Sequence, residues 1–333
     1  MFTKYSVGVL LAAAALSGCG GGGGGGGAAT SPVSGATTYQ AVATAGELIS
    51  YSVDTTALTY SYRVVESAYG KTGATGSGTL TRNVDGTFTP SGFQGKVAVL
   101  DNGLLMGQIY EDLDNNGTRD IIPVIGVSNP ISSIAEAAGI YNFVSLQCSN
   151  VACFSYYGTV KVDPNGTWVS CVRGNLAAPA FNCVESMNGG ISNFSEGRAN
   201  ITVNNVRGGS LIAFKDSNNG QKVVLLDLNG ASALGKGAVF AASQGLPASA
   251  DGNWHYVHSN GSVGIASVTG QNISDSGRSR NGSSYGPTSS TFVVNQPWNG
   301  LVTTANGGLL MPAGSGLYAG YFGANGISVG VKK

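Results

Sequence analysis

The side chains best suited to chemistry form an oxygen-rich run between Asp112 and Asp120. With Asp112 counted as the first position, side-chain oxygens fall at positions one, three, five and nine, a glycine stands at six, and the residue at seven offers its carbonyl. Hard cations need many oxygens converging on one point, and this spacing wraps the chain around such a point. The candidate Ca²⁺ ligands are Asp112, Asp114, Asn116, Thr118 and Asp120.

This run resembles the Ca²⁺ loops of the EF-hand type and its bacterial relatives. It departs from them at position twelve, where Pro123 replaces the bidentate carboxylate of the family. A polar hairpin tip is the alternative, supported by the similar run at 216–220, which lacks most of the carboxylates. A bound Ca²⁺ would be structural.

Catalytic groups are sparse, and we predict none. Residues 282–286 match the Gly-x-Ser-x-Gly sequence motif of a nucleophile elbow. They lie in a Ser-, Gly- and Asn-rich stretch, without the preceding strand and following helix that this motif needs. His255 and His258 are the two histidines, and on a strand their odd separation places them on opposite faces. The alternative is a polysaccharide hydrolase in which Glu111 and Asp120 are the working carboxylates.

Aromatic residues are the other resource for binding. Flat rings stack on sugars and on apolar groups, so an exposed ring indicates a ligand surface. Trp254, beside Asp251 and Asn253, is predicted to be exposed, and Trp254 and Tyr285 are the candidate ligand-binding residues.

The composition predicts an all-β fold. Fifty-three glycines accompany many Ser, Thr, Asn and Val residues, and this mixture favours short strands joined by tight turns. Charged residues make up 10% of the chain with no net charge, which argues against a nucleic-acid partner, since that role needs clustered Lys and Arg.

The pattern of hairpins predicts antiparallel sandwich or barrel units built from β-meanders, in two or three diverged repeats. Residues 93–106 match 298–311 at six of fourteen positions, and a hairpin at 78–88 aligns with 158–168. We place the units at 39–128, 129–247 and 248–333. A short helix is predicted within 131–138 as a connector, and 274–290 as a long mobile loop.

Four cysteines, Cys148, Cys153, Cys171 and Cys183, lie in the second unit. An even set in an exported chain predicts disulfides. Pairing of neighbours, Cys148 with Cys153 and Cys171 with Cys183, is the simplest of three possibilities. A zinc site made of four thiolates is the alternative, although the spacings lack the close pairs of zinc ribbons.

The N-terminus predicts export and lipidation. Lys4 and an uncharged apolar run from Val7 to Leu16 have the layout of a signal peptide, residues 1–18. Ser17 and Gly18 directly before Cys19 resemble the lipobox of bacterial lipoproteins, which implies acylation of Cys19 with palmitate-type chains. Eight glycines follow, so 19–38 is predicted to be a flexible tether.

By the same resemblance, the glycine at position 20 favours sorting to the outer membrane, on its periplasmic face or at the cell surface. The C-terminal segment 316–324 is faintly similar to the barrel ends of transferrin-binding-protein-like surface lipoproteins. We therefore expect a membrane-anchored, non-enzymatic β body that binds a protein or carbohydrate ligand or acts in adhesion or surface structure. An envelope or secretion accessory protein is a further alternative.

Overall fold

The computed structural model describes residues 35–91, 96–100, 102–112, 119–149, 152–178, 183–230, 234–245, 250–323 and 326–332. The chain divides into two units, Met1–Ser34 and Gly35–Lys333. Cys19 and the signal peptide lie outside the described residues, as do Asp114, Asn116 and Thr118.

The first sheet is an antiparallel meander of eight strands. Consecutive strands pair from β1 to β5 and from β6 to β8, and β1 also pairs with β8, which gives the order β5-β4-β3-β2-β1-β8-β7-β6. Its strands are β1 (Thr37–Ala43), β2 (Glu47–Asp54), β3 (Thr59–Ser67), β4 (Thr75–Arg82), β5 (Phe88–Pro90), β6 (Ala98–Val99), β7 (Leu104–Glu111) and β8 (Asp120–Val127).

A single bridge joins the two ends of this sheet. The amide of Phe88 on β5 donates to the carbonyl of Val97 at 2.8 Å, and the amide of Val97 donates back at 2.7 Å. Val97 comes directly before β6 and is fully buried. The first sheet is therefore barrel-like, with its two end strands joined at this one point, whereas the second and third sheets are closed by paired strands.

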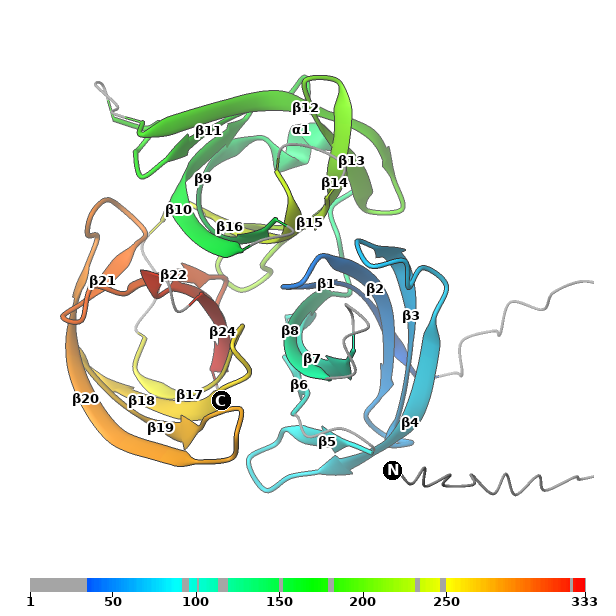
Figure 1. Cartoon of the computed structure of the whole chain (residues 1–333), viewed down its shortest axis with the longest axis vertical. Coiled ribbons are helices and arrows are strands. Elements are labelled where there is room, and N and C mark those ends of the chain that lie inside the picture. The colour runs from blue at the N-terminus through cyan, green and yellow to red at the C-terminus, as the bar shows by residue number, and fades with distance from the viewer. Residues whose placement is uncertain are drawn as a thin grey trace, which may run out of the picture. The chain divides into compact units, whose positions relative to one another are not determined.

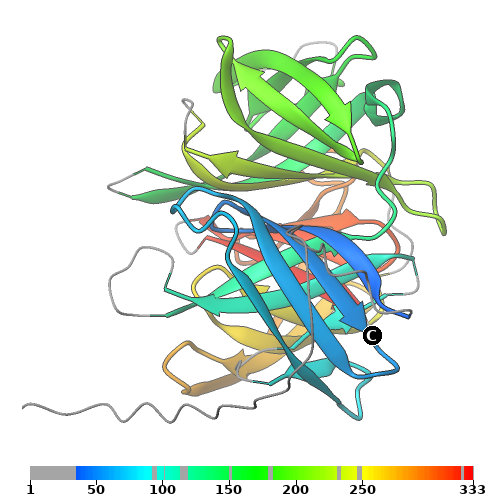
Figure 2. The ribbon, with the colours of Figure 1, turned by 90° about the vertical axis from the view of Figure 1, so that its right-hand side faces the viewer.

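The second and third sheets are closed barrels with the same up-and-down order. Figures 1 and 2 show the strands of each sheet curling around a centre. The second barrel contains β9 (Gly139–Cys148), β10 (Cys153–Val162), β11 (Thr167–Val172), β12 (Glu185–Ser195), β13 (Arg198–Val203), β14 (Val206–Lys215), β15 (Lys222–Asn229) and β16 (Lys236–Ser243).

The third barrel contains β17 (Gly252–His258), β18 (Val263–Thr269), β19 (Asn272–Arg278), β20 (Ser284–Val294), β21 (Val302–Thr304), β22 (Leu309–Ala313), β23 (Leu317–Tyr321) and β24 (Ile327–Lys332). The prediction of an all-β fold built from antiparallel meanders is confirmed. Three units of eight strands are consistent with diverged repeats.

The prediction of a mobile loop over 274–290 is wrong. This stretch supplies most of β19 and the first half of β20, and both strands pair along their length. The sequence is polar on both faces, so it carries no alternation of apolar residues. Closure of the barrel nevertheless requires these strands, because without them β18 and β21 would be open edges.

The connector helix is shorter than predicted. Helix α1 covers Ile134–Ala137, and the Ser133 side chain caps it by accepting a hydrogen bond from the amide of Glu136 at 3.2 Å. Strand β9 begins at Gly139 and ends the helix. Among the described residues, no helix is long and apolar enough to cross a membrane.

Strands in the interior of the fold are buried on both faces. Along β14, Leu211 and Ala213 belong to the apolar cluster inside the second barrel, and Ile212 and Phe214 belong to a cluster shared by all three sheets. The side chains of a strand alternate between its two faces, so one strand serves two cores. Such strands read as continuous apolar runs, without the alternation of a half-exposed strand.

Many strand glycines face an aromatic ring on the neighbouring strand. A Cβ at any of them would lie less than 3.0 Å from the side chain opposite, so only glycine lets the ring lie flat against the sheet. The pairs are Tyr60 with Gly78, Tyr62 with Gly76, Trp168 with Gly189, Tyr256 with Gly264, Tyr285 with Gly277 and Tyr318 with Gly330.

Substitution of one such glycine is expected to destabilise the second barrel. In Gly189→Ala the new Cβ would lie 1.9 Å from the carbonyl oxygen of Thr202 and 2.8 Å from the Trp168 ring, so backbone must move. We expect a loss of about 2 kcal/mol in the free energy of unfolding, measured in urea. Gly190→Ala is the control, because its Cβ would meet only the Thr202 hydroxyl at 3.2 Å. Equal losses in the two variants would contradict this explanation.

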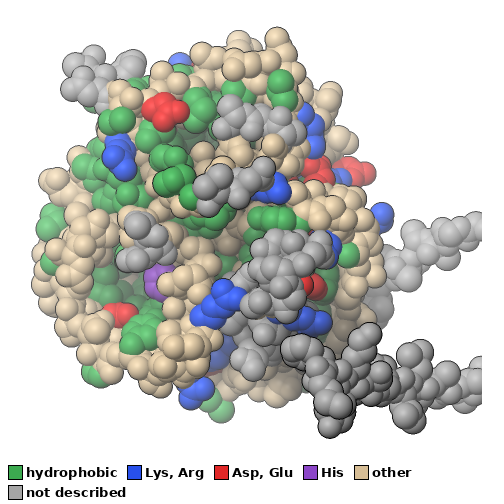
Figure 3. All heavy atoms as spheres, viewed as in Figure 1, with side chains coloured by type: hydrophobic (Ala, Val, Ile, Leu, Met, Phe, Trp, Pro, Cys, Tyr) green, Lys and Arg blue, Asp and Glu red, His purple; other side chains and the backbone are tan. Residues whose placement is uncertain are grey.

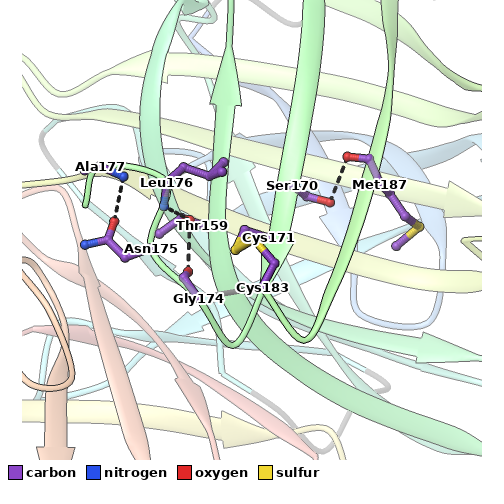
Figure 4. The surroundings of a disulfide bond; sticks show 9 residues. All are labelled: Thr159, Ser170, Cys171, Gly174, Asn175, Leu176, Ala177, Cys183 and Met187. Atoms are coloured by element: carbon purple, nitrogen blue, oxygen red, sulfur yellow. Dashed lines mark hydrogen bonds between the residues drawn. A yellow bond between two sulfur atoms is a disulfide. The ribbon is translucent and has the colours of Figure 1, made fainter. Parts of the chain in front are cut away.

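Two disulfides stabilise the second barrel. Cys148 bonds Cys153 across the β9–β10 hairpin, and Cys171 on β11 bonds Cys183, so neighbouring cysteines pair. Figure 4 shows Thr159 beside the second bridge, where its hydroxyl donates to the Gly174 carbonyl at 3.0 Å and accepts from the Leu176 amide at 2.9 Å. The segment that leaves β11 is therefore fixed at both sides.

Candidate functional site

The third barrel encloses a cavity of about 640 Å³. Every second residue of β17 faces this cavity, namely Trp254, Tyr256 and His258. In Figure 3, hydrophobic, histidine and acidic side chains gather around a hollow over the third barrel. The cavity therefore has an aromatic wall on β17 and polar groups within it.

Smaller side chains line part of the remaining wall. Strands β18, β19 and β20 turn Ala266, Ile273, Thr288 and Ser290 towards the cavity, and these leave the lumen open. The second barrel differs, since Trp168 and Met187 face its lumen and leave a cavity of about 90 Å³. An eight-stranded barrel is wide enough either to be filled by side chains or to hold one small molecule.

A carboxylate and two phenols form the centre of the polar part. The Tyr256 hydroxyl donates to Asp275 Oδ2 at 3.1 Å, and the hydroxyls of Tyr256 and Tyr285 lie 2.6 Å apart. Thr288 donates its hydroxyl hydrogen to Asp275 Oδ1. These four residues come from β17, β19 and β20 and are called the Asp275 cluster below.

A bulge on β20 turns two members of this cluster inward. Thr288 pairs with Asp275 and Tyr285 with Gly277, so three steps on β20 match two steps on β19. The extra residue lies beside Gly286, whose φ of 85° favours glycine. Without the bulge, the odd separation of Tyr285 and Thr288 would place them on opposite faces.

Glycines on the neighbouring strands position the two phenols. A Cβ at Gly264 would lie 2.5 Å from the Tyr256 hydroxyl, and one at Gly277 would lie 2.6 Å from the Tyr285 hydroxyl. Each ring therefore lies over a strand position that has no side chain. This arrangement fixes both hydroxyls at the Asp275 carboxylate.

Burial keeps the other titratable groups of the aromatic wall neutral. It lowers the pKa of His258 to about 4, against a smaller opposing effect of the Asp275 charge. The His258 ring packs edge-on against Tyr256 and Phe322, with ring centroids 5.1 and 5.3 Å away. Burial also raises the pKa of Tyr256 and Tyr285, so both phenols stay protonated.

The two predicted ligand-binding residues both line the cavity, but the predicted exposure of Trp254 is wrong. Trp254 is 8% exposed, donates its ring N–H to the Ala250 carbonyl at 2.8 Å, and packs edge-on against Tyr318. The Trp254 side chain faces the lumen, whereas its polar sequence neighbours Asp251 and Asn253 are not part of the cavity lining. Tyr285 is half-buried in the cavity wall.

The two histidines lie on opposite faces of β17, as their spacing predicts. His258 lines the cavity, whereas His255 is 5% exposed, with its Nε2 3.6 Å from Asp85 Oδ2 of the first sheet. They therefore share no site. Ser283 and Ser284 lie at the turn and at the start of β20, so the surroundings are a hairpin and not a nucleophile elbow.

The Ca²⁺ prediction falls mainly outside the described residues. Asp112 directly follows β7, and the backbone of Asp120 pairs with Glu111 across β7 and β8. Glu111 accepts a hydrogen bond from the Tyr62 hydroxyl at 2.8 Å. Among the described residues, no group of three or more His, Cys, Asp or Glu side chains is placed to hold a metal ion. The Ca²⁺ site stays a prediction.

Comparisons with known proteins give no functional relative. No family model and no curated protein matches the chain. One solved structure that aligns with it is the crystal structure of the beta subunit from DNA polymerase of Streptococcus pyogenes, at 8% identity over 92% of this chain and 93% of that chain. The TM-score is 0.14, so this alignment carries no argument about fold or function.

Proposed function

We propose that this chain is a lipid-anchored outer-membrane protein whose third barrel binds a small, mainly apolar molecule in its lumen. The observation that carries the proposal is the cavity of about 640 Å³. Ligand pockets typically measure roughly 300–1,000 Å³ and combine an apolar lining with a few well-placed polar groups. The aromatic wall on β17 and the Asp275 cluster supply these two parts.

The contacts within the cavity favour binding over catalysis. The Asp275 carboxylate is held by hydroxyl groups, and the described contacts of the His258 ring are with Tyr256 and Phe322. A nucleophile activated by the His258 imidazole would need a hydrogen bond to that ring, and the ring contacts described for His258 are with aromatic side chains. The anchoring part of the proposal rests on Cys19 and the residues before it.

Filling the cavity is expected to abolish binding of an apolar dye. The probe is the neutral dye N-phenyl-1-naphthylamine, whose emission rises when it leaves water. In Ala266→Trp the indole would occupy the lumen, since Ala266 is 8% exposed and lines the cavity. We expect at least a tenfold weaker dye affinity in this variant.

The matched control is Ile265→Trp, one residue earlier on β18, where the side chain is 43% exposed on the outer face. This variant is expected to bind the dye as the wild type does. Far-ultraviolet circular dichroism and thermal melting establish that both variants are folded. Undiminished dye binding by folded Ala266→Trp, or no binding by the wild type, would overturn the proposed function.

A further inference from the structure

Asp275 places a carboxylate inside the cavity without a cationic partner. Among the described residues, Asp275 forms no ion pair with Lys or Arg, and its contacts are the hydroxyls of Tyr256 and Thr288. An ionised carboxylate offers about four acceptor positions, and these contacts use two. The remaining positions are available to a bound molecule.

The hydrogen bonds of the cluster all run towards Asp275. Because the Tyr256 hydrogen is directed at Oδ2, the hydrogen between the two phenols must come from Tyr285. The Thr288 hydrogen is also directed at the carboxylate. The hydroxyl hydrogens of Tyr256, Tyr285 and Thr288 are thus all used in hydrogen bonds within the cluster. The cluster therefore offers a ligand only hydrogen-bond acceptors, and it suits a ligand group that donates.

The charges around the cavity point the same way. His258 is neutral at pH 7 because burial lowers its pKa, and the phenols of Tyr256, Tyr285 and Tyr318 stay protonated because burial raises theirs. Lys332 is the cationic residue of the lining, and its backbone pairs with Trp254. It forms no ion pair with Asp275, so this carboxylate has no cationic partner among the described residues of the lining.

The aromatic wall suits the same kind of ligand. The faces of Trp, Tyr and Phe rings attract organic cations as well as apolar groups, and Trp254, Tyr318 and Phe322 line the cavity with the two phenols of the cluster. A ligand acid would instead meet a carboxylate and a set of acceptors. An alcohol would supply a donor but no charge.

We infer that the cavity selects an apolar molecule that carries a protonated amine, with the amine bound to Asp275 and the apolar part on the aromatic wall. This inference rests on the proposed function, because it specifies the ligand class for the same cavity. An ammonium group brings the opposite charge to its hydrogen bond with the carboxylate and an alcohol brings none, so the amine should be preferred over an alcohol of equal length.

The test is displacement of N-phenyl-1-naphthylamine by three molecules of one chain length, each below its micellar concentration at pH 7. Dodecylamine is expected to displace the dye at a concentration at least tenfold lower than dodecanol, and dodecanoate is expected to be weaker than both. In Asp275→Asn, which keeps the shape and removes the charge, the ratio of amine to alcohol affinity should fall towards one. Asp163→Asn, an exposed carboxyl change on the second barrel, should leave the ratio unchanged.

The outcomes separate this inference from the proposed function. If the dye binds and dodecanoate or dodecanol outcompetes dodecylamine, or if Asp275→Asn keeps the wild-type ratio, the inference is overturned and the cavity remains a ligand site. If the wild type binds neither the dye nor any of the three molecules, both are overturned.

Discussion

Replacement of Glu47 by glutamine is expected to remove a contribution that lowers the stability of the wild type as the pH rises from 4.5 to 7. Glu47 begins β2 and is fully buried; its Oε1 accepts from the Ser67 hydroxyl at 2.7 Å, and its Oε2 has no hydrogen-bond partner among the described residues. Burial raises the pKa of Glu47 from 4.5 to about 7, the nearby charge of Glu111 adds to the increase, and Ser67 and Lys71 oppose it.

The direction of the pH dependence follows from proton binding. Between pH 4.5 and 7 the unfolded chain has released this proton and the folded chain still holds it, so the free energy of unfolding falls as the pH rises. Each pKa unit corresponds to about 1.4 kcal/mol, which amounts to about 3 kcal/mol over the window. Glutamine does not titrate, so this contribution should disappear in Glu47→Gln.

A second buried carboxyl lies close to Glu47. Asp227 on β15 is fully buried, and neither of its oxygens has a hydrogen-bond partner among the described residues. Burial and the charges of Glu66 and Glu47 raise its pKa well above the usual range, against the attraction of Arg207. Asp227→Asn should therefore remove a second part of the pH dependence. The effects of Glu47→Gln and Asp227→Asn on the free energy of unfolding should not be additive, because the charge of one carboxylate makes ionisation of the other less favourable.

The measurement is urea unfolding at intervals between pH 4 and 8. At each pH, the free energy of unfolding of the wild type is subtracted from that of the variant, and the change of this difference with pH is compared. A packing penalty of glutamine or asparagine that does not vary with pH then cancels. Glu185→Gln, at an exposed position on β12, is the control and should follow the wild type at every pH. Burial of His258 adds an opposite contribution in the same window, because its lowered pKa makes the folded state more stable as the pH rises. The test is therefore the difference between variant and wild type, and a Glu47→Gln variant with the wild-type slope would rule out this explanation.

The fold class was predictable from composition because glycine-rich, β-branched sequences with few long helix formers have few alternatives to hairpins. The alignments were a weaker guide. The hairpin at 78–88 forms the fourth and fifth strands of its barrel, and the aligned hairpin at 158–168 forms the second and third of the next. Residues 274–290 were missed since a barrel can require a polar strand that no local pattern marks.

The site was predictable only in part. Trp254, Tyr256 and His258 alternate along one stretch, and this spacing of aromatic side chains is a readable signal of one strand face. Asp275 and Thr288 carry no such signal. They meet the phenols through the pairing of β19 with β20 and the bulge at Gly286, and no pattern of apolar residues in this polar hairpin marks either feature.

Replacement of Cys19 by serine is expected to release the protein from the membrane completely. Each buried methylene of an acyl chain contributes about 0.8 kcal/mol, a single chain binds reversibly, and more than one chain anchors a protein stably. Serine cannot form the thioether, so the variant should lose all acyl chains and move to the soluble fraction after ultracentrifugation. Mass spectrometry of the N-terminal peptide reports the modification directly.

A second variant separates anchoring from sorting. By resemblance to bacterial lipoproteins, Gly20→Asp should keep the lipid and shift the protein from the outer to the inner membrane in a density gradient. Cys19→Ser protein that stays in the membrane pellet, or wild-type protein with an unmodified Cys19 or an uncleaved leader, would contradict lipidation. Since the cavity of the third barrel lies within residues 250–332, the soluble Cys19→Ser protein should still bind the neutral dye, which makes the anchor and the ligand site independent of each other.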